Sequence, residues 1–224
     1  MNKQIFAYFF WILLLLPFRV GLGQNQSDAG ECWDVLYEQG FEEVEEGGLP
    51  EDFFILEGQF SVAKRDGRKC LVLPGHPVDE HGFLFGPRLN SSNVELSFSC
   101  LGGFKSRKHN VYAGALSGVR GIHFRINPSF RDFRVTHSDY EKHRDGIIWS
   151  PKEWMRVDIL AQPEKERKTR LRVHIYPAVS GGEDGWKSIF FVDGLLVGGK
   201  CALWGFSYAE QEMAWDDLVI RGPK

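Results

Sequence analysis

A strict alternation of apolar and polar residues is the feature that most limits how this chain can fold. Between residues 94 and 100, Val94, Leu96 and Phe98 are apolar and the residues between them are polar. Side chains two positions apart lie on one face of a strand, so this period indicates a strand with one buried face. The pattern returns at residues 122–126 and 169–176, and roughly a dozen short strands separated by turn residues are expected in total. We therefore predict an all-β fold, an antiparallel sandwich of two sheets, without amphipathic helices.

The first 23 residues have the pattern of a secretory signal peptide. Lys3 precedes an apolar run over residues 5–16, and small residues stand before the expected cleavage site. The run is shorter than the roughly 20 residues that a membrane-spanning helix needs. An uncleaved anchor is the alternative, because Arg19 interrupts the approach to the cleavage site. We expect a secreted protein, periplasmic or extracellular, with no membrane span after cleavage.

The rest of the chain has the size of one domain. We assign residues 24–40 to a polar leader and residues 41–222 to the sandwich. The signal segment holds two basic residues and no acidic ones, so its removal takes the formal net charge from −3 to −5. A mildly acidic chain argues against a nucleic-acid partner, which would require a basic excess.

The four cysteines allow two interpretations. An oxidising compartment permits disulfides, and Cys70–Cys100 is then the favoured pair because their strands are close in sequence. Alternatively, Cys70, Cys100 and Cys201 are free thiols, because each sits in an apolar strand segment where cysteine acts as a small hydrophobe. Cys32 is the fourth, and no spacing suggests zinc.

Several segments, taken in order, resemble one fold family. They are FEE at residues 41–43, GGLPEDFFILEGQFSV, RDGRKCLVLPG, RGIHFRI, SPKEWMRVDIL, GKCALWGFS and the closing MAWDDLVI. Together they resemble the concanavalin A-like, or laminin-G-like, jelly rolls, and are most similar to uncharacterised secreted bacterial members. The resemblance spans most of residues 41–220. It implies two antiparallel sheets packed face to face, with glycan binding on the concave outer face as the commonest use.

Motifs for catalysis are missing from the sequence. Jelly-roll glycanases carry acids at alternate positions, as in E-x-D-x-E, so that two carboxylates flank the scissile bond. Glu43 and Glu45 are the nearest imitation, and their acid-rich segment is more typical of a solvated edge. The Q-x-H and Y-x-K-x-G segments of jelly-roll lyases and the G-x-S-x-G of serine hydrolases are absent. We assign no catalytic residue; an atypical site around His123, His137 and Tyr140 is the alternative.

The resemblance also implies one candidate metal site. In such domains an acid of the opening strand and an acid of the closing strand can help hold a structural calcium ion, and Glu42, Asp216 and Asp217 match those positions. Carboxylate oxygens suit Ca²⁺. Asp216 and Asp217 are adjacent in a strand and should face opposite ways, so at most one of them would join such a site easily. The alternative is a carboxylate at a strand end that accepts hydrogen bonds from backbone amides. No other cofactor is expected.

Outward basic residues and tryptophans near turns form the candidate glycan site. We predict as ligand-binding residues His123, Arg125, Arg134, His137, Arg172, Trp149 and Trp186. Trp154, Trp204 and Trp215 lie within strand segments and are predicted to be core. A cationic floor of this kind would suit sulfated or uronic glycans. The alternative is a solvated face whose arginines pair with Asp132 and Glu141.

These features favour a secreted, non-catalytic recognition module that binds carbohydrate on the concave sheet. The alternatives are a glycan-cleaving hydrolase or lyase with an atypical site, and a structural protein of an envelope or matrix. The expected partner is a glycan or an envelope protein.

Overall fold

The computed structural model describes most of the chain after residue 32. It covers residues 33–75, 79–102, 104–105, 108–116, 118–119, 121–137, 140–181, 186, 188–193, 198–207 and 211–223. The expected signal peptide, most of the polar leader and Cys32 lie outside these residues.

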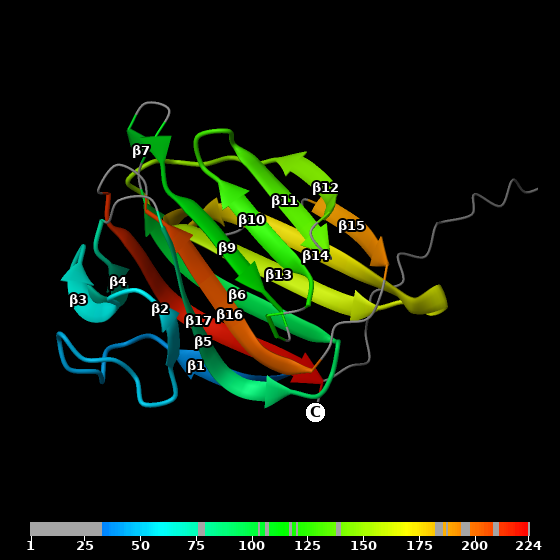
Figure 1. Ribbon diagram of the computed structural model, residues 1–224, viewed down its shortest axis with the longest axis horizontal. Helices are drawn as coiled ribbons and strands as arrows, with labels where there is room; N and C mark the ends of the chain where they lie inside the picture. Colours follow the sequence, from blue (N-terminus) through cyan, green and yellow to red (C-terminus); the bar gives the residue numbers. More distant parts are fainter. Residues whose placement is uncertain are drawn as a thin grey trace, which may run out of the picture. The chain divides into compact units, whose positions relative to one another are not determined.

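Two antiparallel sheets form a sandwich, as predicted (Figure 1). The eight-stranded sheet has the order β15-β14-β13-β6-β17-β4-β3, with β1 paired to β17. Its strands are β1 (Trp33–Gln39), β3 (Ser61–Arg65), β4 (Arg68–Leu73), β6 (Val94–Gly102), β13 (Met155–Pro163), β14 (Lys168–Pro177), β15 (Ser188–Asp193) and β17 (Met213–Pro223).

The seven-stranded sheet has the order β12-β11-β10-β9-β16-β5-β2. Its strands are β2 (Phe54–Glu57), β5 (Glu80–Leu89), β9 (Val111–Ala115), β10 (His123–Asn127), β11 (Asp132–His137), β12 (Tyr140–Gly146) and β16 (Gly199–Phe206). A small hairpin, β7 (Phe104–Lys105) with β8 (Lys108–His109), and two short 3₁₀ turns, η1 (Lys165–Arg167) and η2 (Ala178–Ser180), complete the described elements. None of the helical turns in these ranges could cross a membrane.

The apolar residues of the alternating segments form the core between the two sheets. Leu96 on β6 pairs with Ile159 on β13, which pairs with Val173 on β14, and all three are buried. Trp215 is fully buried, and its ring packs against those of Phe60, Phe83 and Tyr112. Rows of apolar side chains facing inward supply the burial that holds the two sheets together.

The last strand, β17, changes partners along its length. Its first half pairs with β4 and its second half with β1, with a bulge between Asp216 and Val219. At the bulge Asp217 has a φ of 49°, in the left-handed region. The pairing with β1 also shows that the sheet includes Trp33–Gln39, ahead of residue 41. The apolar alternation in β1 is weak because it is an edge strand with one neighbour, so the sequence pattern did not reveal it.

The favoured Cys70–Cys100 disulfide is not formed. Cys70, Cys100 and Cys201 are free and buried, as in the alternative interpretation. Leu71 and Cys100 both pair with Trp215 and belong to the core between the sheets, whereas Cys70 packs with Trp154 on the outer side of the same sheet. The two thiols therefore lie on opposite faces of one sheet.

Candidate functional site

The outer face of the seven-stranded sheet brings together three of the predicted ligand-binding residues. His123 and Arg125 lie on β10, and Arg134 lies opposite Arg125 on β11. The register extends this pair into a row with one residue from each of six neighbouring strands. That row, called here the arginine–tryptophan row, consists of Arg144, Arg134, Arg125, Ala113, Trp204 and Gly82.

The aromatic end of the row is built on a glycine. A Cβ at Gly82 would lie 2.2 Å from Cδ1 of Trp204, so the missing side chain lets the indole lie against the sheet. The imidazole of His123 stacks with this indole at 5.7 Å between ring centres and 16° between planes. His123 Nε2 also lies 2.7 Å from the carbonyl oxygen of Val119. Trp204 and His123 therefore form a half-buried aromatic surface, in which the indole is held by the sheet and by the imidazole, and the imidazole contacts the carbonyl oxygen of Val119.

The charged end of the row mixes arginines with two acids. The Cζ atom of Arg125 lies 4.4 Å above the ring centre of Phe206, a cation–π contact that leaves this side chain exposed. Arg134 donates hydrogen bonds to Asp132 at 3.0 Å and to Glu141 at 3.3 Å. The pairing proposed as the alternative to a glycan site is therefore present for Arg134, whereas Arg125 faces an aromatic ring.

Asp132 is the buried centre of the charged end. Arg144 forms a second ion pair with it, and Asn127 donates a hydrogen bond to it at 2.6 Å. Burial by itself opposes ionisation of this carboxyl, but the hydrogen bonds from Arg134 and Asn127 and the charges of Arg134 and Arg144 outweigh it and lower the pKa of Asp132. Asp132 thus stays a carboxylate that orders the arginines around it.

The other predicted ligand-binding residues lie elsewhere. Arg172 is on β14, in the eight-stranded sheet, because alternation shows that a residue faces outward without showing which sheet it belongs to. Trp149 is buried and its ring packs on Tyr112, so it offers no platform. Trp186 lines a cleft on the eight-stranded sheet. His137 pairs with Tyr140 at the end of the β11–β12 hairpin, and their side chains lie outside the described set.

Sequence reasoning missed two aromatic residues of the site. Trp204 was predicted to be core, and Phe206 was not singled out. In β16 the outward Trp204 alternates with the inward Cys201 and Leu203, so both faces of the strand are apolar. The residue that distinguishes the outward Trp204 from a core tryptophan is its partner Gly82 on the neighbouring strand, and this pairing is known only once the strand register is known.

The three acids predicted to bind calcium are not gathered into a ligand set. The bulge in β17 turns the carboxylates of Asp216 and Asp217 to the same side, against expectation, and both contact Nη1 of Arg68 at 3.3 Å. Glu42 instead accepts a hydrogen bond from the backbone of Lys69. In the part of the chain that the structure describes, no three histidine, cysteine, aspartate or glutamate side chains could hold a metal ion. The two aspartates therefore share the guanidinium of Arg68.

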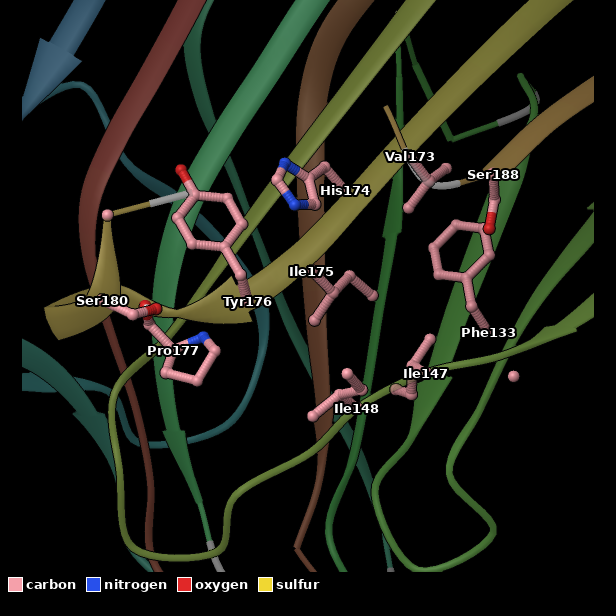
Figure 2. Close-up of a pocket in the computed structure, with 12 residues that line it drawn as sticks. Phe133, Ile147, Ile148, Val173, His174, Ile175, Tyr176, Pro177, Ser180 and Ser188 are labelled. Atoms are coloured by element: carbon pink, nitrogen blue, oxygen red, sulfur yellow. The ribbon is translucent and has the colours of Figure 1, made fainter. Parts of the chain in front are cut away.

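A cavity of about 390 Å³ is lined by residues of β11, of β14 and of the segment that follows β12, and by no residue of the arginine–tryptophan row (Figure 2). Its lining is largely apolar and includes Phe133, Ile147, Ile148, Val173 and Ile175. Its polar lining residues are His174, Tyr176, Ser180 and Ser188, and none of its described lining residues is an arginine or lysine that could bind an acidic ligand. The sheet face, which combines an indole with guanidinium groups, is the better candidate site.

Comparison with solved structures confirms the fold class. No protein-family model matches the chain, and no curated protein matches its sequence. The PL-14 alginate lyase from Aplysia kurodai matches with a TM-score of 0.59 at 8% identity, over 85% of this chain and 100% of that one. The carbohydrate recognition domain of Emp47p matches with 0.57 at 10% identity, over 88% and 100%. The exoplasmic domain of VIP36, in a form bound to Ca²⁺ and Man3GlcNAc, matches with 0.56 at 9% identity, over 79% and 86%. The chain has the concanavalin A-like jelly-roll fold.

Proposed function

We propose that this chain is an exported carbohydrate-recognition module that binds glycans on the outer face of the seven-stranded sheet. The observation that carries the proposal is the arginine–tryptophan row, which places guanidinium groups and a half-exposed indole on one continuous surface. Sugars are held by the combination of an aromatic face and planar hydrogen-bonding groups. The similarity to an alginate lyase, to a carbohydrate recognition domain and to a domain solved with bound Man3GlcNAc supports a carbohydrate ligand.

An acidic glycan fits this surface best. Arg125, Arg134 and Arg144 stand in the row, and Asp132 and Glu141 neutralise only two of their three charges. A carboxylate or sulfate group would bind near Arg125, while the apolar face of the sugar ring would stack on Trp204. Charge-assisted bonds to arginine contribute about 1.5 to 3 kcal/mol each, which makes them the main source of selectivity.

The acids of this face are poorly suited to hydrolysis. A general acid must hold a proton near neutral pH, which requires a raised pKa. Burial opposes ionisation of Asp132, but its hydrogen bonds and the neighbouring arginines outweigh burial and lower its pKa. Glu141 is paired with Arg134. This favours recognition without cleavage.

Cleavage of uronic glycans by elimination is the second candidate. One observation favours it: His123 lies beside Arg125 on the same face, so a proton acceptor and a cation for a carboxylate are close together. Incubation with alginate and measurement of the ultraviolet absorbance of unsaturated products would separate the two functions. The recognition proposal predicts binding with no increase in absorbance.

A binding assay with immobilised glycans tests the proposed function. The probes are alginate oligosaccharides, a sulfated glycan such as heparin, and neutral mannose oligosaccharides. We expect the acidic probes to bind, Arg125→Ala to weaken binding by about tenfold or more, and Trp204→Ala by about threefold to tenfold. Arg167→Ala, in the exposed η1 turn, removes the same charge away from the face and serves as the matched control.

Two outcomes would refute this assignment. One is binding by none of the probes. The other is binding that Arg125→Ala and Trp204→Ala leave equal to that of the Arg167→Ala control.

Export is tested separately. If the first 23 residues are a signal peptide, mass spectrometry of the protein recovered from an exporting host will show a chain that begins at Gln24. Recovery in the membrane fraction with residue 1 intact would support the uncleaved anchor instead.

A further inference from the structure

A polar cleft lies on the outer face of the eight-stranded sheet, which is the opposite side of the sandwich from the arginine–tryptophan row. Its volume is about 280 Å³. The lining comes from four neighbouring strands, β17, β6, β13 and β14, and from a tryptophan just ahead of β15. The residues are Glu95, Arg156, Asp158, His174, Tyr176, Trp186 and Arg221.

The four charged side chains of the cleft form two ion pairs. Arg156 donates from Nε to Asp158 at 3.3 Å, and its Nη1 donates to the backbone carbonyl of Asp217 at 2.9 Å. Arg221 donates from Nη1 to Glu95 at 2.6 Å, and the buried Ser97 donates to the same carboxylate oxygen at 3.2 Å. The cleft is therefore electrically balanced and its polar groups are held in place by the sheet.

Aromatic rings form another part of the cleft. The rings of His174 and Tyr176 lie 4.4 Å apart, and Figure 2 shows them side by side on β14. Burial, followed by the charge of Asp158 and the hydrogen bond to it, raises the pKa of Tyr176 to about 12. The phenol is therefore a neutral donor at physiological pH. Trp186 adds an indole to the lining.

We propose that this cleft is a second ligand-binding site, for a neutral, hydroxyl-rich ligand the size of one sugar ring. Hydroxyl groups of the ligand would donate to Glu95 and Asp158 and accept from Arg156 and Arg221, as planar polar groups allow. The indole of Trp186 would cover the apolar face of the ring. The inference stands independently of glycan binding on the seven-stranded sheet.

Size and charge balance argue for this class of ligand. The volume lies near the lower end of small-molecule pockets, which run from about 300 to 1,000 Å³, so a single ring fits and an oligosaccharide does not. An anion would gain little, because each guanidinium already faces a carboxylate. The charged side chains remain partly open to solvent, with 17% to 37% of their surface exposed, so a ligand can reach them.

Titration with methyl glycosides, followed by the indole signals of the tryptophans in NMR spectra, tests the proposal. The probes are the methyl glycosides of glucose, galactose, mannose and N-acetylglucosamine, with methyl glucuronide as the charged comparison. We expect at least one neutral glycoside to bind with a dissociation constant of roughly 1 to 10 mM and to shift the Trp186 signal. Trp186→Ala and Glu95→Gln should each weaken that binding about fivefold or more.

Trp204→Ala is the matched control, because it removes an indole from the opposite face. It should leave the affinity for the neutral glycoside unchanged. The proposal is overturned if no neutral glycoside binds, if methyl glucuronide binds more tightly than all of them, or if Trp186→Ala and Glu95→Gln bind as the unaltered protein does. Glu95→Gln is the safer of the two variants for folding, because Arg221 is partly exposed and can be rehydrated.

Discussion

Two buried aspartates, one on the outer face of each sheet, have pKa values that are shifted in opposite directions. Asp132 on the seven-stranded sheet and Asp216 on the eight-stranded sheet are 3% and 2% exposed. The pKa of Asp132 is lowered, because the partners that bind it outweigh its burial. The pKa of Asp216 is raised to about 6, first by burial and then by the charge of Asp217.

The number of cations per carboxylate explains the difference. Asp132 receives two guanidinium groups, from Arg134 and Arg144, whereas Asp216 shares Arg68 with a second carboxylate. The charged end of the arginine–tryptophan row therefore has more arginines than acids, whereas the polar cleft and the Asp216–Asp217 cluster have at least one carboxylate for each guanidinium. This contrast is the physical reason to expect an acidic ligand on the first face and a neutral one on the second.

The largest expected effect follows from removing the charge of Asp216. A carboxyl with a raised folded-state pKa destabilises the fold once it is ionised, so the free energy of unfolding falls as pH rises from about 4 to above 6. Asp216→Asn should therefore stabilise the protein at pH 7.5 by up to about 3 kcal/mol, at 1.36 kcal/mol per pKa unit. Urea unfolding at pH 7.5 and at pH 4 measures this. A variant that is less stable at pH 7.5, or equally stabilised at pH 4, would contradict the explanation.

Removal of an acid from the polar cleft should have a smaller effect on stability, and one of opposite sign. Asp158→Asn leaves Arg156, which is only 17% exposed, without its charged partner. Because this guanidinium cannot be fully rehydrated, we expect a loss of about 2 kcal/mol in the free energy of unfolding at pH 7. Chemical denaturation of the variant measures it, and a loss below that of the equivalent change on the other face would break the comparison.

That equivalent change is Asp132→Asn, with an expected loss of about 1 kcal/mol at pH 7. Its partners Arg134 and Arg144 are 30% and 51% exposed and regain water. Since the pKa of Asp132 is lowered, its stabilising effect is present above the ordinary value of 3.8 and is lost as pH falls below it. The difference between variant and unaltered protein should therefore shrink in acid. A difference that persists at pH 2 would show that the ionised form is not what stabilises.

The smallest change in stability is expected for Gly82→Ala. The new Cβ would displace the indole of Trp204, but this side chain can tilt into solvent, so less than about 1 kcal/mol should be lost. Near-ultraviolet circular dichroism should nevertheless change, because the stack with His123 is disturbed. The same substitution in a Trp204→Phe background provides the control. An unchanged spectrum would mean that Gly82 does not position the indole.

Local pattern was sufficient to predict the strands with one apolar face. The alternation at residues 94–100 and 169–176 matches β6 and β14, and the antiparallel two-sheet sandwich that it predicted is confirmed. The strand β12, with the sequence YEKHRDG, was missed because it is an edge strand without an apolar face. Apolar residues at every second position identify a strand with one buried face. A strand that is polar on both faces has no such pattern and cannot be recognised in this way.

The site was only partly predictable, because it depends on which strands are neighbours. Arg125 and Arg134 were expected to face outward together, and register places them opposite one another. Arg172 has the same alternation but belongs to the other sheet. The joint orientation of Asp216 and Asp217 depends on a bulge with a positive φ, which no local pattern indicates.

An NMR titration of the tryptophan indole groups with an alginate oligosaccharide tests the central claim most directly. The account predicts that the Trp204 signal shifts in a saturable way, while those of the buried Trp149 and Trp215 stay in place. It also predicts that Arg125→Ala reduces the shift. A saturable shift confined to Trp186 or Trp154, or no shift of any indole signal, would contradict glycan binding on the seven-stranded sheet.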